Sequence, residues 1–179
     1  MTKFLLALLL TPNVVVAADD SIVLRTNYYA VSGATFRELR ADIAQKRPWK
    51  TDNDGYTAWK IDWSFTTASS DSDCHLQSFQ TKTAITITLP RWVPPPEADA
   101  ELREKWTGYF QALLAHEDGH KRMALAAANE IRKKVNDIGS TIRCAELEAA
   151  VNRAVNQIIN DFKQREKAYD TRTNHGRML

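Results

Sequence analysis

The stretch Ala115-His116-Glu117-Asp118-Gly119-His120-Lys121 contains a His-Glu-x-x-His motif. This motif is the starting point for predicting the fold and the functional site. The motif requires a helix, because residues four apart face the same way in a helix. Apolar residues recur at helical spacing on both sides: Leu102, Trp106, Tyr109, Phe110 and Leu113 before it, and Ala124, Ala127, Ala128, Ile131 and Val135 after it. We therefore expect one long helix from about Glu97 to Asp137.

On such a helix, His116 and His120 lie about 6 Å apart along the axis, so both imidazoles can bind one zinc ion. Glu117 lies beside them, where its carboxylate can take a proton from a zinc-activated water. The alternative is a solvated helix face that carries two histidines by chance. Gly119 lowers helix stability by about 1 kcal/mol relative to Ala, so we expect tertiary contacts to hold the helix at this point.

The N-terminus has the features of a cleaved signal peptide at residues 1–18. Lys3 provides a positive charge, residues 4–10 form an apolar run, and small residues precede the predicted cleavage site after Ala18. The apolar run is too short to span a bilayer. We expect a secreted or periplasmic protein whose mature chain, residues 19–179, forms one domain.

The mature chain is nearly neutral. Removing Lys3 from the 24 basic residues leaves 23, against 22 acidic residues. The sequence has no basic stripe, so nucleic acid is not an expected partner. No segment of the mature chain is apolar enough to span a membrane. The expected partner is a polypeptide substrate, and the sequence indicates no oligomeric state.

Two cysteines in an exported chain predict a disulfide bond between Cys74 and Cys144. This bond would close a loop of about 70 residues and stabilise the fold by about 4 kcal/mol. The alternative, two thiolate ligands of zinc, does not suit an oxidising compartment.

Several segments before the motif helix have the alternation of β-strands. Ser21 to Val31 is the first, and a short helix with Thr35 as its N-cap follows. The later strands are Trp59 to Phe65, Cys74 to Phe79 and Thr83 to Leu89. They predict an antiparallel meander of three or four strands, in which Thr83 to Leu89 forms an edge for an extended substrate.

The segment after Gly139 predicts a second helix that packs antiparallel on the motif helix, with apolar residues at helical spacing from Ile142 to Phe162. The apolar pattern ends around Tyr169-Asp170, and Thr171 to Leu179 is a polar tail. The predicted fold class is therefore α+β. A small antiparallel sheet packs on helices in a zincin-like arrangement, with the active site below the sheet on the motif helix.

Several motifs together resemble one known family. They are the signal peptide, Leu89-Pro90-Arg91-Trp92, Trp106 ahead of the His-Glu-x-x-His motif, and a closing Tyr169-Asp170-x-x-Thr173-x-His175-Gly176. As a set they resemble the bacterial predicted secreted zinc-dependent proteases, the domain of unknown function 922 family. The resemblance covers essentially the whole mature chain. It implies a zinc-dependent protease and His175 as a zinc ligand beside His116 and His120.

Catalytic zinc normally has three protein ligands and one open position, and the motif helix supplies two. The resemblance favours His175 as the third. Asp170 either accepts a hydrogen bond from a ligand imidazole or is itself a ligand. His75 on a strand, and Glu146 and Glu148 at the start of the last helix, are the other candidates.

The expected reaction is hydrolysis of a peptide bond, with Glu117 as the base. Tyr169 is a candidate donor to the oxyanion, and a packing role is its alternative. A last helix of about 30 residues overshoots the motif, so the tail has to fold back to bring His175 to the site. Two other functions remain open: a zinc-binding envelope protein without turnover, and an interaction module in which the histidines are incidental.

Overall fold

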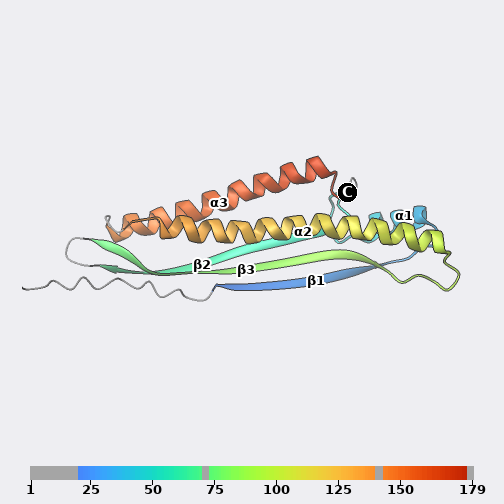
Figure 1. Ribbon diagram of the computed structural model, residues 1–179, viewed down its shortest axis with the longest axis horizontal. Helices are drawn as coiled ribbons and strands as arrows, with labels where there is room; N and C mark the ends of the chain where they lie inside the picture. The colour runs from blue at the N-terminus through green and yellow to red at the C-terminus, as the bar shows by residue number, and fades with distance from the viewer. Residues whose placement is uncertain (1–19, 70–72, 140–142, 177–179) are drawn as a thin grey trace, which may run out of the picture.

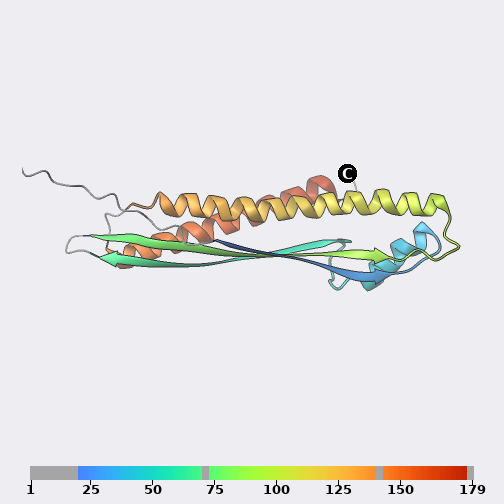
Figure 2. The ribbon, with the colours of Figure 1, turned by 60° about the horizontal axis from the view of Figure 1, so that its bottom comes forward.

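The computed structural model describes residues 20–69, 73–139 and 143–176, and the predicted signal peptide lies outside them. The elements are β1 (Ser21–Val31), α1 (Phe36–Lys46), β2 (Tyr56–Ser69), β3 (Cys74–Trp92), α2 (Ala100–Asn136) and α3 (Cys144–Thr173). The two long helices lie on one face of a long twisted sheet, and α1 lies at the end of the sheet where β1 finishes (Figure 1, Figure 2). None of the helices in the described ranges has the length and hydropathy to cross a bilayer.

The sheet is mixed, so the expectation of an antiparallel meander is wrong. Its strand order is β1-β3-β2, with β3 antiparallel to β2 and parallel to β1. The reason lies in α1, whose segment carries the chain across the end of the sheet after β1. The chain then returns along β2, and β3 is inserted between the two earlier strands. The α+β class itself is confirmed.

β3 is a single strand of 19 residues rather than two shorter ones. The alternation of buried side chains continues through Thr81, which is 3% exposed, so the pairing is not interrupted at this point. Because β3 is central, Thr83 to Leu89 pairs on both sides and is not an edge. The edges of this three-stranded sheet are β1 and β2.

The main core lies between strands β2 and β3, the C-terminal half of α2 and about the first two thirds of α3. Ile61 is buried in it, and Trp59, Trp63 and Phe65 pack against it, as their alternation predicts. The helices contribute apolar side chains that are almost fully buried: Ala127, Ala128, Ile131, Val135, Leu147, Val151, Val155, Ile158 and Phe162.

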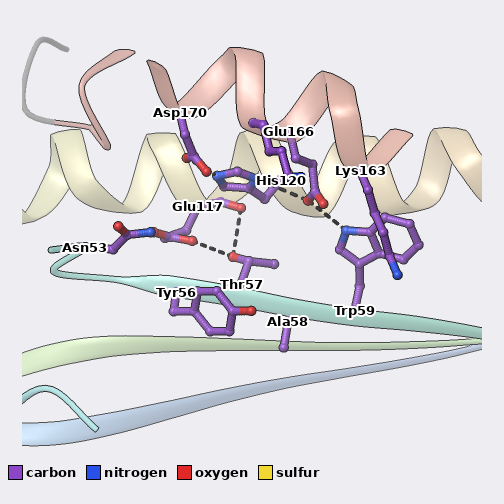
Figure 3. Close-up of a pocket in the computed structure, with 11 residues that line it drawn as sticks. Asn53, Tyr56, Thr57, Ala58, Trp59, Glu117, His120, Lys163, Glu166 and Asp170 are labelled. Atoms are coloured by element: carbon purple, nitrogen blue, oxygen red, sulfur yellow. Dashed lines mark hydrogen bonds and ion pairs between the residues drawn. The ribbon is translucent and has the colours of Figure 1, made fainter. Parts of the chain in front are cut away.

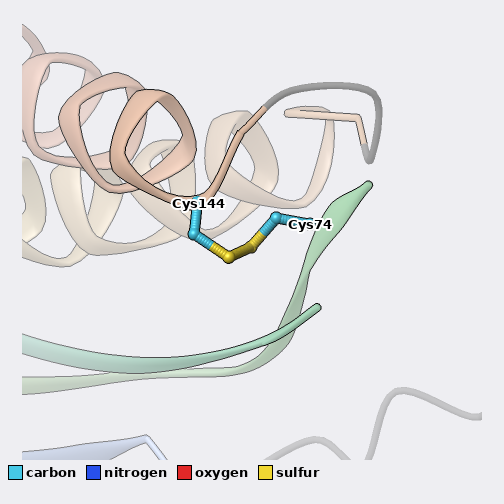
Figure 4. The surroundings of a disulfide bond; sticks show 2 residues. All are labelled: Cys74 and Cys144. Atoms are coloured by element: carbon cyan, nitrogen blue, oxygen red, sulfur yellow. A yellow bond between two sulfur atoms is a disulfide. The ribbon is translucent and has the colours of Figure 1, made fainter. Parts of the chain in front are cut away.

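The predicted disulfide between Cys74 and Cys144 is confirmed, with the two Cα atoms 5.0 Å apart (Figure 4). It ties the start of α3 to the start of β3. As a result, α3 begins beyond the C-terminal end of α2 and runs back along it (Figure 1). The predicted overshoot is therefore wrong, since the helix itself brings Asp170 level with His116.

α3 also continues to Thr173, so the polar tail does not begin at Thr171 as expected. The apolar pattern fades here because α3 packs on the histidines of α2 rather than on aliphatic side chains. Thr173 is buried and contacts the ring of His116. The chain then leaves the helix through a turn at residues 174–176, all of which have positive φ angles.

Candidate metal centre

The His-Glu-x-x-His motif lies on α2, as predicted, with all three side chains turned into the protein. His116, Glu117 and His120 are 1%, 2% and 7% exposed. The motif is therefore not a solvated helix face. Polar groups buried to this degree are costly unless they are paired, so their partners define what the site can do.

The partners come from α3, where Glu166 and Asp170 lie one helical turn apart and face α2. The Glu166 Oε1 atom lies 3.1 Å from His120 Nδ1. The Asp170 Oδ1 atom lies 3.1 Å from His116 Nε2 and 2.9 Å from His120 Nε2. Two pairs of residues at i, i+4 spacing, one on each helix, thus form a single polar cluster.

Both Nδ1 atoms carry protons, because each faces an acceptor. Glu166, as a carboxylate, can only accept a hydrogen bond, so His120 Nδ1 donates to it. The hydroxyl of Thr173 donates to the carbonyl oxygen of Tyr169 at 2.8 Å, so its oxygen accepts from His116 Nδ1 at 3.1 Å. In the neutral imidazoles, both Nε2 atoms therefore bear free lone pairs.

These lone pairs converge on one point. The two Nε2 atoms are 3.2 Å apart, and both lie about as close to Asp170 Oδ1. Three acceptor atoms this close repel one another unless a cation, either a proton or a metal ion, lies between them. The pKa of His120 also indicates that the site attracts a cation. Burial lowers this pKa, but hydrogen bonds with Asp170 and Glu166 raise it to about 9, so the ring holds a proton more strongly. Burial opposes ionisation of Asp170, yet the two histidines hold its pKa well below the usual range.

The donor atoms fit a zinc ion. In tetrahedral zinc sites with bonds of about 2.0–2.1 Å, neighbouring donor atoms are about 3.3–3.4 Å apart. The three donors of His116, His120 and Asp170 are 2.9–3.2 Å apart, so a small outward shift matches that spacing. Within the described ranges, these residues form the group of histidine and carboxylate side chains that can hold a metal ion. Three protein donors leave one coordination position open.

His175, the predicted third ligand, lies next to this group without belonging to it. Its Nδ1 atom is buried, accepts or donates no hydrogen bond within the described structure, and lies 3.6 Å from Asp170 Oδ1. Its backbone has a φ of 53°, a left-handed conformation that His, Asn and Asp adopt more often than other non-glycine residues. The turn after α3 thus brings the His175 imidazole to the site, and its role as a ligand stays a prediction.

The other candidate ligands lie far away. His75 pairs with Ala68, eleven residues along β2 from Thr57, which contacts Glu117; this separation corresponds to about 36 Å of strand. Glu146 precedes Asp170 by 24 residues of α3, again about 36 Å. Glu148 is only about 3 Å closer along the same helix.

Glu117 projects from α2 toward the start of β2. Its Oε2 atom accepts a hydrogen bond of 2.6 Å from the Thr57 hydroxyl. Gly55 lies against the other oxygen, where a Cβ atom would come within 2.7 Å of Oε1. Burial raises the pKa of Glu117. The Thr57 hydrogen bond and the nearby histidines act to lower it, but the effect of burial is larger. A carboxylate with a raised pKa is a better proton acceptor at neutral pH.

A partly buried ion pair fixes the segment that holds Glu117. Asp54 is 2% exposed and pairs with Arg40 of α1. Its carboxylate also accepts a hydrogen bond of 3.0 Å from Tyr109 of α2, and its carbonyl accepts one from Tyr29 of β1. Three elements thus hold the residue directly before Gly55, which keeps the start of β2 against the motif helix.

Tyr169 packs on both histidines. Its ring stacks on His116, with centroids 4.9 Å apart, and its hydroxyl donates to the His116 carbonyl oxygen at 3.4 Å. Gly119 makes this contact possible, since a Cβ atom would lie 2.4 Å from the Tyr169 hydroxyl. The expected tertiary contact at Gly119 is therefore present. The proposed oxyanion role of Tyr169 stays a prediction, and the observed contacts are those of packing.

A pocket of about 380 Å³ opens onto the site between α3 and the start of β2. Figure 3 shows Glu117, His120 and Asp170 on one side of it and residues 56–59 of β2 on the other. The Trp59 indole donates to Glu166 Oε1 at 2.7 Å and closes one end. The buried donor atoms of His120 and Asp170 are therefore reached from this pocket.

Three residues of the site were not anticipated: Glu166, Thr57 and Thr173. Glu166 could have been found, because Glu166-x-x-x-Asp170 repeats the spacing of His116-x-x-x-His120. Thr173 belongs to the closing motif of the family resemblance, which gave it no role, and Thr57 gives no signal. Both roles depend on how α2, α3 and β2 meet.

The sequence of this chain was compared with family models, curated proteins and solved structures. A family model described as "Bacterial protein of unknown function (DUF922)" matches residues 26–176. No curated protein and no solved structure matches the chain. The matched region contains all residues of the candidate site. The chain belongs to the DUF922 family of bacterial proteins of unknown function.

Proposed function

We propose that this protein is an exported zinc-dependent peptidase, with His116, His120 and Asp170 as zinc ligands and Glu117 as the general base. One observation carries the proposal: three potential donor atoms, two imidazole nitrogens and one carboxylate oxygen, lie within 3.2 Å of one another beside a buried glutamate and an open pocket. A structural zinc site is normally closed by four protein ligands. Here three donors and a pocket favour a catalytic site.

A zinc ion in this position would supply Lewis-acid chemistry that polarises a peptide carbonyl and activates water. The chain's own residues do the rest. Glu117 takes the proton of the attacking water and passes it to the nitrogen of the leaving amine. Glu166 and Thr173 hold the two imidazoles with their Nε2 atoms toward the site.

The pocket also suggests how a polypeptide would bind. Tyr56 to Trp59 of β2 line it, and β2 is an edge of the sheet. An extended peptide can add to such an edge through main-chain hydrogen bonds, which places its backbone beside Glu117. This edge replaces Thr83 to Leu89 in the proposal. Export is supported by the disulfide bond, which suits an oxidising compartment.

The test compares wild-type mature protein with Glu117→Gln in zinc content and in cleavage of casein or a peptide library. The amide keeps the shape of the side chain but cannot accept the proton, so activity should fall by several orders of magnitude while zinc is retained. Glu130→Gln is the matched control, since Glu130 lies on the same helix with a side chain that is 47% exposed.

Equal activity in Glu117→Gln would show that Glu117 is not the base. Stoichiometric zinc without cleavage by the wild type would instead favour the zinc-binding envelope protein. Absence of zinc binding would favour the interaction module.

A further inference from the structure

The charged side chains that line the pocket fall into two groups. Its three carboxylates all have partners: Glu117 bonds to Thr57, Glu166 to His120 and Trp59, and Asp170 to both histidines. Lys163 and Lys167 of α3 also line the pocket. Within the described structure, neither lysine side chain makes an ion pair or a hydrogen bond.

The two lysines lie on the same side of α3 as the site. Lys167 precedes Asp170 by three residues and Lys163 by seven, or about 4.5 Å and 10.5 Å along the helix. Figure 3 shows Lys163 reaching from α3 toward β2 at the Trp59 end of the pocket. Both lysines therefore lie on the same side of Glu117 along the pocket. Because the positive charge is on one side only, it can favour one chain direction of a bound peptide over the other.

A peptide on the β2 edge has a preferred direction. Antiparallel pairing is slightly more stable per residue than parallel pairing. A strand antiparallel to β2 has its N-terminal part at the Trp59 end, beside Lys163, and its C-terminal part near Tyr56. With about 3.3 Å per residue, the two lysines lie within about three residues of the bond next to Glu117.

We propose that Lys163 and Lys167 make this site selective for polypeptides with an acidic side chain one to three residues before the cleaved bond. This inference rests on the proposed peptidase function. An acidic side chain there would gain two cations that have no partner among the described residues. A basic side chain at the same place would face like charges, which lowers binding.

The experiment uses three sets of three peptides. Each set varies one of the three positions before the cleaved bond, and its peptides differ only in carrying Glu, Gln or Lys there. The zinc-loaded wild type should cleave the Glu peptide with a kcat/KM at least tenfold above that of the Lys peptide. The double substitution K163E/K167E should reverse that order, and K163Q/K167Q should abolish the preference. K133E/K134E makes the same change of charge at exposed positions in the last turn of α2 and should leave the preference intact.

Equal kcat/KM for the Glu and Lys peptides in the wild type would overturn the inference, as would an equal shift in K133E/K134E. A preference for Glu after the cleaved bond would overturn the antiparallel orientation. If the wild type cleaves none of the peptides, the peptidase proposal fails. Binding of the same peptides, measured by fluorescence polarisation, then decides the lysine claim by itself: tenfold tighter binding of the Glu peptide supports it, and equal binding overturns it.

Discussion

The two halves of the α2–α3 pair pack in opposite ways. Near the disulfide, Ile131 and Val135 of α2 lie in an apolar core with Leu147 and Val151 of α3, and all four are fully buried. About three turns further along, the same helices meet through histidines on α2 and carboxylates on α3. One half stabilises the fold by removing apolar surface from water, whereas the other buries groups that must find partners.

This difference indicates what each half is for. The apolar half needs nothing beyond the chain itself. In the polar half, every buried group of the two histidines has a partner except the Nε2 lone pairs, which face one carboxylate oxygen. The apolar half thus holds the helices at a fixed spacing. On our proposal, the polar half uses that spacing to shape a cation site.

The largest expected effect is on zinc binding. Asp170→Ala should weaken zinc affinity at least about 1,000-fold, because it removes one of three donors and the negative charge. Asp161→Ala, an exposed position on the same helix, should change the affinity less than twofold. Competition with a chelator of known affinity measures both.

His175→Ala tests whether His175 or Asp170 is the third zinc ligand. On our assignment His175 approaches the site without completing the group of three donors, so its loss should reduce affinity about tenfold. A larger loss for His175→Ala than for Asp170→Ala would make His175 the third ligand.

The apolar half should show the reverse behaviour. Leu147→Ala should lower the free energy of unfolding by about 3 kcal/mol, since it leaves a cavity in a fully buried site. Zinc affinity should change less than threefold. Leu114→Ala, at a side chain that is 43% exposed, should cost less than about 1 kcal/mol. Urea unfolding of metal-free protein provides the comparison, and a large loss of affinity in Leu147→Ala would show that the two halves are not separable.

A smaller effect concerns pH. The pKa of His120 is raised in the folded protein to about 9, so its contribution to stability is complete below the unfolded value near 6.5 and is lost as the pH rises through 9. Metal-free protein should therefore lose on the order of 2 kcal/mol of stability between pH 6.5 and 9. His120→Gln should remove that dependence, and an identical pH profile in this variant would contradict the account.

The sequence predicted local features well. The span of β1, the Thr35 N-cap, the long motif helix and the disulfide all agree with the structure. Each rests on short-range signals such as alternation, capping or cysteine count. The His-Glu-x-x-His motif predicted which side chains of α2 would be buried together.

Features that depend on how distant segments of the chain meet could not be predicted from short-range sequence signals. The parallel pairing of β1 with β3 follows from the path of the chain across the end of the sheet. The place of Asp170 follows from where α3 begins, which Cys144 and its bond to β3 determine. Thr57 lies 60 residues from Glu117, and a lone threonine gives no sequence signal for that contact.

The central claim is that the polar half of the helix pair binds zinc through His116, His120 and Asp170. X-ray absorption spectroscopy of zinc-loaded mature protein, repeated on Asp170→Ala, tests it most directly. We predict one zinc per chain, bound by two imidazole nitrogens and one carboxylate oxygen at about 2.0–2.2 Å, with the carboxylate lost in the variant. Less than stoichiometric zinc, or an unchanged ligand set in Asp170→Ala, would contradict the claim.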